Sequence, residues 1–476
     1  MELKTKEQLI SLFEKHYNEE IIAFEQLPAS GSYRQYCRLK SENRQIIGAF
    51  NSDLKENHAF LEFSYHFKKH DLPVPEIYKV SDDQAHYLIE DLGDTTLFDY
   101  IGQHRQLEDF SENIVNQYKK VLSILPGFQI NAGSDLDYNN CYPRNAFDKQ
   151  SMMWDLNYFK YYFLKLAQIP FDEQALEDDF QNFSDYLLST NINYFLYRDF
   201  QSRNIMLKEG KVYFIDYQGG RKGALQYDLA SLLYDAKADI PQHVRNKLLE
   251  YYLDQLEKHI PVNRDEFKSF FSGYVIIRIM QAMGAYGFRG FYEKKEHFLK
   301  SIPFALENLK YILNNHTIGV ELPELFSVLK KVTDSQVLRE IAKKEGKLTV
   351  RITSFSYKHG IPEDPSGNGG GFVFDCRAIH NPGRYEEYKH LSGKDKKVQE
   401  FLENNSNIDE FLSSVFALVS QSVKKYLSRG FSHLSVNFGC TGGQHRSVYS
   451  AEKLAEYLKN NFPVEIVLQH REQENW

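Results

Sequence analysis

The sequence predicts an α+β unit, with a small β-rich lobe and a large helical lobe, followed by a smaller α/β unit with a mainly parallel sheet. Before about residue 93, short strand-like runs predominate, and helical sequence follows almost without interruption to about residue 337. Beyond about residue 349, apolar strand-like runs alternate with helical segments, which is typical of a parallel sheet. A chain of 476 residues is long enough for several packed cores.

The small lobe, about residues 20–93, overlaps an N-terminal segment that we expect to be helical over residues 1–25. Alternating apolar residues predict strands near Phe24–Leu27 and Tyr33–Leu39, and also in RQIIGAF, VPEIYKV and HYLIEDL. A helix is expected near His58–His70. The turn PASGS, between the first two strands, is rich in small residues.

The helical lobe, about residues 94–337, is interrupted by two strand-like stretches, Tyr194–Phe200 and Val212–Gln218. Together the two lobes form a first domain over residues 1–337, and the charged segment 338–348 is the predicted linker. In the second domain, residues 349–476, the predicted strands are LTVRITSFSY, FVFDCRAI, HLSVNF and PVEIVLQHR. Helices are expected near Asp395–Leu402, near Ile408–Ser428 and in VYSAEKLAEYLKN.

Composition restricts the partners and the compartment. The net charge of −8 argues against general nucleic-acid binding. The four cysteines form no CxxC pair, which is typical of a reducing compartment and disfavours a zinc ribbon. No apolar run approaches the roughly 18 residues that a membrane span needs, and the N-terminal segment is charged, unlike a signal peptide. We therefore expect a soluble cytoplasmic protein that does not bind membranes.

The stretch LYRDFQSRNIML, followed by KVYFIDYQGG, places an Asp, an Asn five positions later and a second Asp after a strand. These residue types are those that phosphoryl transfer from ATP requires: Asp199 as the base for the acceptor hydroxyl, with Asn204 and Asp216 as Mg²⁺ ligands. Acidic loop residues near strands are also common without any function. The small-residue turn, LIEDLGD and QYDLASLLYD nevertheless occur in the order that a kinase needs, and Asp228 is placed to brace the catalytic loop.

Residues of about 20–335 resemble the aminoglycoside phosphotransferase family of kinase-like enzymes, in GSYRQYCRL, HDLPVPEIY, LIEDLGDTTLFDY, YRDFQSRNIML, FIDYQG and YDLASLLYD. Within that family they look most like the kinases that phosphorylate N-acetylmuramate and N-acetylglucosamine. The resemblance implies a protein-kinase-like bilobal fold, catalysis by Asp199 and Mg²⁺ binding by Asn204 and Asp216. It also implies that the small-residue turn and the hinge bind ATP, through Ser30, Gly31, Ser32, Glu90, Asp91 and Leu92.

Two departures from the family pattern concern the nucleotide. Tyr197 stands where a His usually precedes the Arg-Asp pair, and the strand expected to carry a Lys reads IIGAFNSD, so Glu62 has no obvious partner. An inactive kinase is the alternative, which the intact catalytic Asp and metal ligands disfavour. The acceptor pocket has four candidates, each of which is equally an ordinary helix or loop residue: Trp154, Asp155, Gln218 and Gln281.

The stretch FGCTGGQHRS joins a predicted strand to a predicted helix. Its glycines let backbone N–H groups converge on an anion, and His445, Arg446 and the hydroxyls of Thr441 and Ser447 can add hydrogen bonds. The Cys-x5-Arg-Ser spacing also fits a cysteine phosphatase. However, Gly439 stands where phosphatases commonly have His, and no acid loop is visible. The stretch is therefore interpreted as a phosphate cradle.

From about residue 350 to 476 the chain resembles the C-terminal domain of the RNase adapter family (RapZ-like), in SFSYKHGIP, FVFDCRAIHNPGRY, LSGKDKKVQEFL, GCTGGQHRSV and QHRE. That domain senses glucosamine-6-phosphate and contacts RNA and protein. The resemblance implies a sugar-phosphate site formed by His359, Asn381, Thr441, Gly442, Gly443, His445, Arg446 and Ser447. Gln444 replaces the usual Lys, and the family's P-loop domain is absent, so an RNA or protein partner is the weaker expectation.

The two domains together predict an ATP- and Mg²⁺-dependent kinase of a small sugar, with a second domain that binds an amino-sugar phosphate as effector. The alternative is a non-catalytic sensor or adapter that binds nucleotide, glucosamine-6-phosphate and RNA. A nucleotidyltransferase would need its own nucleotide motif, and the sequence shows none.

Overall fold

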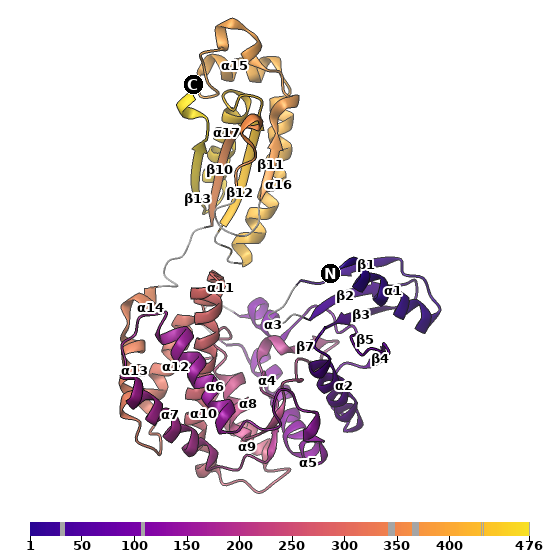
Figure 1. Cartoon of the computed structure of the whole chain (residues 1–476), viewed down its shortest axis with the longest axis vertical. Helices are drawn as coiled ribbons and strands as arrows, with labels where there is room; N and C mark the ends of the chain where they lie inside the picture. The colour runs from indigo at the N-terminus through magenta and orange to yellow at the C-terminus, as the bar shows by residue number, and fades with distance from the viewer. Residues whose placement is uncertain are drawn as a thin grey trace. The chain divides into compact units, whose positions relative to one another are not determined.

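Two compact units make up the chain, Met1–Ala342 and Lys343–Trp476 (Figure 1). This computed structural model describes residues 1–28, 34–105, 110–340, 348–363, 371–429, 431 and 433–475. Over those ranges, no helix is both long and apolar enough to cross a membrane. Each unit has a buried hydrophobic core of its own, so each is described by itself.

The small lobe of the first unit is an antiparallel sheet with the strand order β1-β2-β3-β5-β4. Because side chains alternate along a strand, Leu39 and Leu88 pack with α1 on one face, whereas Ala49 and Tyr87 pack with α2 on the other. The elements are α1 (Leu3–Tyr17), β1 (Ala23–Gln26), β2 (Gln35–Lys40), β3 (Gln45–Phe50), α2 (Leu54–Lys69), β4 (Ile77–Val80) and β5 (His86–Glu90).

The N-terminal helix is shorter than the predicted residues 1–25. It ends at Tyr17, because Asn18 adopts the left-handed backbone conformation with φ 54° and donates its N–H to the Glu14 carbonyl. Strand β1 then begins at Ala23. Asn takes this conformation more readily than most residues and often ends helices, so Asn18 is a stop signal that the prediction overlooked.

Helix α2 brings a carboxylate to the end of β3. Asp53 caps the helix, and its side chain accepts the backbone N–H groups of Lys55 and Glu56. Glu56 lies in the first turn, where the helix dipole favours a negative charge. Asn51 Nδ2 donates to Glu56 Oε2 at 2.9 Å, which fixes this carboxylate beside the point where β3 ends.

The large lobe is helical, and two short antiparallel strand pairs carry its polar loops. Strand β6 (Tyr194–Leu196) pairs with β9 (Arg221–Gly223), and β7 (Ile205–Lys208) pairs with β8 (Lys211–Phe214). The tight turn between β7 and β8 places Glu209 and Gly210 at φ 52° and 75°.

The α-helices of this lobe are α3 (Leu97–His104), α4 (Glu112–Pro126), α5 (Gly133–Asp135), α6 (Lys149–Phe159), α7 (Glu173–Leu188), α8 (Leu225–Leu233), α9 (Gln242–Leu256), α10 (Arg264–Tyr286), α11 (Glu296–Leu299), α12 (Ile302–Asn315), α13 (Pro323–Asp334) and α14 (Gln336–Glu340). Its π-helical and 3₁₀ segments are η1 (Gly127–Ala132), η2 (Tyr138–Asn140), η3 (Lys160–Leu164), η4 (Ser202–Asn204) and η5 (Gly287–Tyr292).

The second unit is a parallel sheet in the order β11-β12-β10-β13, with helices packed against it. Ser356 lies opposite Cys440 in the register of β10 and β12, so the loops that follow these two strands meet at one edge. The elements are β10 (Thr349–Ser356), η6 (Tyr357–His359), β11 (Phe372–Asp375), η7 (Cys376–Ala378), η8 (Pro382–Arg384), η9 (Glu386–Tyr388), α15 (Lys396–Asn405), α16 (Ile408–Arg429), β12 (His433–Cys440), α17 (Arg446–Asn461), β13 (Glu465–His470) and η10 (Gln473–Asn475). The predicted fold class, an α+β unit followed by a parallel α/β unit, is confirmed.

Candidate functional site

The loop that follows β6 carries Asp199 and is held by buried contacts. Asp228 on α8 accepts the backbone N–H groups of Tyr197 at 2.8 Å and Arg198 at 3.0 Å. The Tyr197 hydroxyl donates to the Ile215 carbonyl at 2.6 Å, which ties this loop to the chain just after β8. Tyr197, which stands where the family pattern has His, therefore fixes the loop through its hydroxyl.

Asp199, Asn204 and Asp216 lie together, although Asp199 and Asn204 come from the loop after β6 and Asp216 follows β8. Asn204 Nδ2 donates to the Asp199 backbone carbonyl at 2.8 Å and to Asp216 Oδ2 at 3.1 Å. An amide that donates through Nδ2 keeps Oδ1, its only oxygen, for a cation. Oxygen ligands of this kind suit Mg²⁺, so the donor set fits the metal that the sequence predicts.

Electrostatics and backbone conformation both mark Asp216 as a functional position. Burial, and then the neighbouring Asp199 charge, raise the pKa of Asp216 above its ordinary value. A divalent cation would offset both effects, because it supplies the positive charge that the two carboxylates lack. Asp216 also has φ 70°, and Arg198 has φ 82°, a conformation that costs a non-glycine residue about 1–3 kcal/mol and is concentrated at functional sites.

A cation that sequence reasoning missed approaches the same centre from the small lobe. Arg34, just before β2, is buried and forms an ion pair with Glu56 at 3.1 Å. Gln218 Nε2 then bridges Glu56 Oε1 at 3.3 Å and Asp216 Oδ1 at 2.7 Å. The family pattern suggests a Lys on β3 paired with Glu62; the structure instead pairs Arg34, just before β2, with Glu56, six residues before Glu62.

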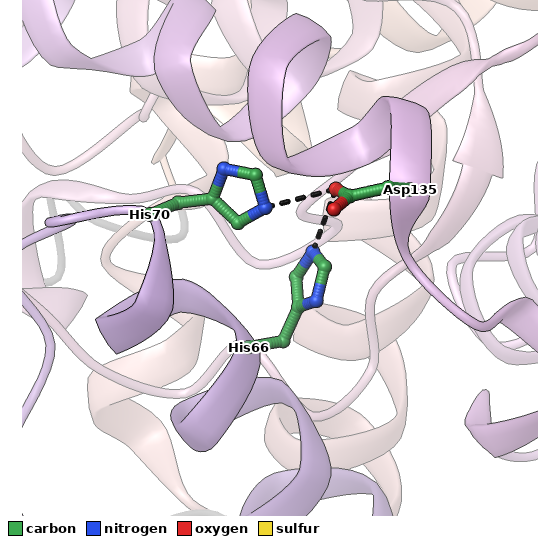
Figure 2. A group of neighbouring side chains, drawn as sticks. All are labelled: His66, His70 and Asp135. Carbon is green, nitrogen blue, oxygen red and sulfur yellow. Dashed lines mark ion pairs between the residues drawn. The ribbon is translucent and has the colours of Figure 1, made fainter.

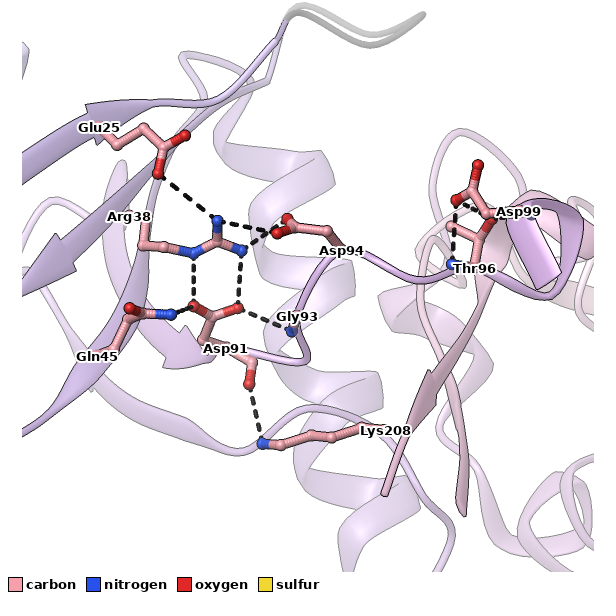
Figure 3. A network of polar contacts seen from close by, with 9 residues as sticks. All are labelled: Glu25, Arg38, Gln45, Asp91, Gly93, Asp94, Thr96, Asp99 and Lys208. Atoms are coloured by element: carbon pink, nitrogen blue, oxygen red, sulfur yellow. Dashed lines mark hydrogen bonds and ion pairs between the residues drawn. The ribbon is translucent and has the colours of Figure 1, made fainter. Parts of the chain in front are cut away.

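The hinge after β5 is held by a network of side chains (Figure 3). Arg38 binds Asp91 through Nε at 2.6 Å and also pairs with Asp94 at 2.8 Å. Lys208 Nζ pairs with Glu90 at 3.0 Å and donates to the Asp91 carbonyl at 2.9 Å. One hinge carbonyl is therefore already bonded. The remaining predicted nucleotide contacts, Ser30, Gly31 and Ser32, lie outside the described residues.

Asp199 lines a cavity of about 170 Å³ in the large lobe, which residues of η4, α8 and α10 help to form. The volume is below the roughly 300–1,000 Å³ of pockets for drug-sized ligands, so it suits a small acceptor. Its polar and charged lining includes Arg203, Asp235, Lys237, Arg278 and Gln281.

Positive charge predominates in this cavity. Arg278 is only 6% exposed, and its Nε and Nη1 donate to neutral partners, Ser231 Oγ at 2.9 Å and Gln281 Oε1 at 2.7 Å. Within the part of the chain that the structure describes, Arg203, Lys237 and Arg278 form no ion pair with a carboxylate. A buried guanidinium without a carboxylate partner is costly, and a negatively charged ligand would relieve that cost.

The four residues that the sequence offered as candidates for the acceptor pocket do not all line the same cavity in the structure. Gln281 lines the Asp199 cavity, as expected. Asp155 instead pairs with Arg198 at 2.7 Å beside Asp199, and Gln218 bridges Glu56 and Asp216. Trp154 is exposed and does not line that cavity. The Asp155–Arg198 and Gln218–Glu56 contacts join residues that are far apart in the chain. No sequence pattern therefore distinguished these residues from residues that line the cavity.

In the second unit, the loop between β12 and α17 turns at Gly443, which has φ 68°. A Cβ atom there would lie 2.4 Å from Glu472 Cγ and 2.9 Å from the Ser356 nitrogen, so only glycine fits. Thr441 and Gly442 are exposed just before α17. They belong to the loop that leads into the N-terminus of α17, the kind of helix end where an anion is favoured.

Cys440 and Arg446 do not have the arrangement of a phosphatase. Cys440 is 2% exposed, and its Sγ accepts the Gly443 N–H at 3.2 Å. Arg446 is 4% exposed, and its Nη1 donates to the carbonyls of Arg377 at 2.9 Å and Ile379 at 2.8 Å. A shielded thiol and a guanidinium bonded to backbone support the loop rather than attack and clamp a phosphate.

The other residues predicted to bind the sugar phosphate differ in their solvent exposure. His359 is exposed, and its Nδ1 lies 2.7 Å from Oε2 of the buried Glu472. His445 is buried with Nε2 2.8 Å from the Tyr388 carbonyl, and burial lowers its pKa, which favours the neutral ring. Glu472, which orients His359, was missed by the sequence analysis, although it ends the quoted word QHRE.

The remaining members of the predicted set hold the loop in shape. Asn381 Oδ1 accepts the Gly383 N–H at 3.2 Å, and a Cβ at Gly383 would lie 3.2 Å from the His445 ring. Ser447 Oγ lies 3.1 Å from Cys440 Sγ. The structure thus brings the set to one edge of the sheet, with His359, Thr441 and Gly442 as its exposed members.

Each of the two units matches the model of a known protein family. Residues 26–263, which are half of the chain, match the family model of the phosphotransferase enzyme family. The chain therefore belongs to the phosphotransferase enzyme family. Residues 348–474 match the RapZ C-terminal domain. The two resemblances inferred from the sequence are confirmed.

Curated relatives and solved structures are each similar to part of the chain. A nucleotide-binding protein of Thermotoga neapolitana is 35% identical over 199 residues, which cover 38% of this chain and 68% of that protein. One of Thermosipho africanus is 36% identical over 160 residues, and the match spans 34% of this chain and half of that protein. The crystal structure of choline kinase from Cryptosporidium parvum matches 68% of this chain and 99% of its own, with 12% identity and a TM-score of 0.47.

Proposed function

We propose that the first unit is an ATP- and Mg²⁺-dependent kinase that phosphorylates a hydroxyl of an amino sugar such as N-acetylmuramate or N-acetylglucosamine. The observation that carries this proposal is the convergence of Asp199, Asn204 and Asp216 beside a small cavity that Asp199 itself lines. ATP would contact the hinge at Glu90 to Leu92 through backbone groups other than the Asp91 carbonyl, which is bonded to Lys208, and the Glu90 N–H, which donates to the Glu76 carbonyl at 2.9 Å.

In this reaction the acceptor hydroxyl in the cavity loses its proton to the Asp199 carboxylate as its oxygen attacks the γ-phosphorus of ATP. The bond from the γ-phosphorus to the β–γ bridging oxygen breaks, and ADP leaves. Asn204 and Asp216 would hold Mg²⁺, which neutralises charge on the phosphate oxygens. Arg34 and Glu56, through Gln218, fix the position of Asp216 relative to the small lobe.

The charge of the cavity favours an acceptor that carries a carboxylate. Arg203, Lys237 and Arg278 would repel polycationic aminoglycosides and would attract the lactyl carboxylate of N-acetylmuramate. N-acetylglucosamine lacks that group and otherwise has the same sugar ring. The two sugars therefore form a related pair that differs at O3, where one carries the lactyl carboxylate and the other a free hydroxyl.

The test is ATP consumption by the full-length protein with N-acetylmuramate, N-acetylglucosamine, glucosamine and aminoglycosides. We expect turnover with the acetylated amino sugars and a higher kcat/KM for N-acetylmuramate. Lys237→Met and Arg278→Gln should reduce that preference, whereas the surface variant Lys247→Gln should keep it. Turnover with none of these compounds would refute the amino-sugar assignment, and equal kcat/KM for the two acetylated sugars would refute the role of the cavity charge.

We propose that the second unit binds an amino-sugar phosphate such as glucosamine-6-phosphate at the edge formed by His359, Thr441 and Gly442. The exposure of these residues, two of which lie in the loop that leads into the N-terminus of α17, supports this. Calorimetry of the full-length chain with glucosamine-6-phosphate tests it, and Cys440→Ser should bind equally well because the thiol is not a nucleophile. A covalent phosphocysteine at Cys440, or no binding, would overturn the proposal.

A further inference from the structure

A second candidate metal site lies in the first unit, away from Asp199 and Asp216. His66, near the end of α2, and His70, just after it, are one helical turn apart and project to the same side. Asp135, at the end of α5, places its carboxylate against both imidazoles (Figure 2). Of the His, Cys, Asp and Glu side chains that the structure describes, these form the group of three whose ligand atoms lie within 4.8 Å of one another.

The geometry is closer to that of metal ligands than to that of a hydrogen-bonded triad. His70 Nε2 and His66 Nε2 lie 2.8 Å and 3.4 Å from the same oxygen, Asp135 Oδ1. His70 Nε2 is buried and has no hydrogen-bond partner, because the carboxylate oxygen lies outside hydrogen-bond geometry. Ligands about 2.1 Å from a tetrahedral zinc are separated by about 3.4 Å, so small side-chain movements would complete a site.

We propose that His66, His70 and Asp135 bind a zinc ion, or another transition-metal ion that prefers imidazole, and not Mg²⁺. Two imidazoles and one carboxylate are a common zinc donor set, whereas Mg²⁺ prefers oxygen ligands alone. Water or the Ala132 carbonyl takes the fourth position. His66 Nε2 lies 2.8 Å from that carbonyl and would carry the ring proton on Nδ1 instead when it binds the metal.

The position of the site indicates its role. Helix α2 carries Glu56 ten residues before His66, which is about 15 Å along the axis. The metal ion would therefore be remote from the catalytic carboxylates. It would join the C-terminal end of α2, which packs on the small-lobe sheet, to α5 of the large lobe, and so fix the helix that holds Glu56.

The test measures zinc retained by the full-length protein after desalting, by elemental analysis, and the thermal unfolding midpoint with and without a chelator. Excess Mg²⁺ and ATP occupy the nucleotide site throughout. We expect the wild type to retain one zinc ion, and its midpoint to rise by about 3–5 °C at a free zinc concentration about 100 times Kd. The double variant His66→Gln/His70→Gln should retain none and should lose the midpoint shift.

Two control variants make the outcome specific. His58→Gln removes an exposed imidazole from the same helix and should behave as the wild type does. Asp216→Asn alters the proposed Mg²⁺ site and should leave zinc retention unchanged, which separates this proposal from the proposed function. Absorption bands of Co²⁺ bound to nitrogen and oxygen should appear in the wild type and vanish in the double variant. Equal metal uptake by wild type and double variant, or loss of uptake in Asp216→Asn, would overturn the proposal.

Discussion

The loop around Asp199 and the loop around Gly443 both suit phosphate, yet they are built in opposite ways. In the first unit, polar side chains face one another, and burial and like charge raise the pKa of Asp216. In the second unit, the groups that resemble a nucleophile and a clamp, Cys440 and Arg446, are buried and bonded to neighbouring groups. The exposed residues of the predicted set there are His359, Thr441 and Gly442.

This difference distinguishes a site for chemistry from a site for recognition. A reacting centre needs unsatisfied charge that a metal ion and a transition state can stabilise. A recognition loop needs a rigid shape and backbone donors, and it is most stable when its side chains are already satisfied. The Cys-x5-Arg spacing alone does not separate the two, whereas the burial of Cys440 and the partners of Arg446 do.

The largest effect should come from Asp199→Asn. Removal of the base and of its negative charge should reduce kcat with the preferred amino sugar by about 10²–10⁴-fold. Glucosamine-6-phosphate binding, measured by calorimetry, should not change, because it belongs to the other unit. Asp185→Asn, an exposed surface carboxylate on α7, is the control. Unchanged turnover in Asp199→Asn would favour a non-catalytic adapter.

Glu56→Gln should reduce kcat/KM for ATP by about 10–100-fold, because it leaves the buried Arg34 without its acidic partner and loosens the bridge to Asp216. Glu62→Gln on the same helix should have little effect. Steady-state kinetics at varied ATP concentration measure both variants. A loss in Glu62→Gln equal to that in Glu56→Gln would mean that the ion pair has no special part in nucleotide binding.

Gly443→Ala should destabilise the second unit by about 1–2 kcal/mol and weaken sugar-phosphate binding, since φ is 68° and the added Cβ meets Glu472 and Ser356. Gly442→Ala is the matched control, because a Cβ there has nothing within 4 Å. Urea unfolding and calorimetry give the two quantities. If Gly442→Ala destabilised the unit as much as Gly443→Ala, the close packing at Gly443 would not be the cause.

A further effect, spread over several pH units, is a pH dependence of the stability of the first unit. Burial raises the pKa of Asp228 from an ordinary value near 3.8 to about 7. Between these values the folded protein binds a proton that the unfolded chain has lost, so this group makes stability fall as pH rises, by at most about 1.4 kcal/mol per pH unit. Urea unfolding of wild type and Asp228→Asn from about pH 5 to about pH 8 should show the wild type losing stability relative to the variant. A constant difference would contradict the raised pKa.

Sequence patterns predicted most of the architecture, because strand alternation and the order of motifs are local properties. They also named Asp199, Asn204 and Asp216, whose spacing reflects one loop and one strand end. Arg34 and Glu56 were missed because their pairing joins β2 to α2 across the sheet, and no spacing in the chain expresses that contact. The family pattern suggests a Lys on β3, whereas the cation, Arg34, lies just before the neighbouring strand β2.

The acceptor cavity was the least predictable part. Arg203, Lys237 and Arg278 come from segments up to 75 positions apart, and the cavity forms only when α8 and α10 pack together. Asp155 and Gln218 were placed in that pocket because amides and carboxylates bind sugars. In the folded chain each of these residues instead contacts a charged side chain. Tertiary contacts, which the sequence does not express, decide whether such a residue lines the cavity.

The ammonium of Lys208 against the Asp91 carbonyl has a consequence for inhibitor design. A purine mimic that offers an N–H donor to that carbonyl would meet a hydrogen bond already formed, together with a positive charge. A scaffold that offers a lone pair at that place would instead accept from Lys208. Such compounds would discriminate this protein from kinases whose hinge carbonyls are open, without relying on any contact in the cavity that Asp199 lines.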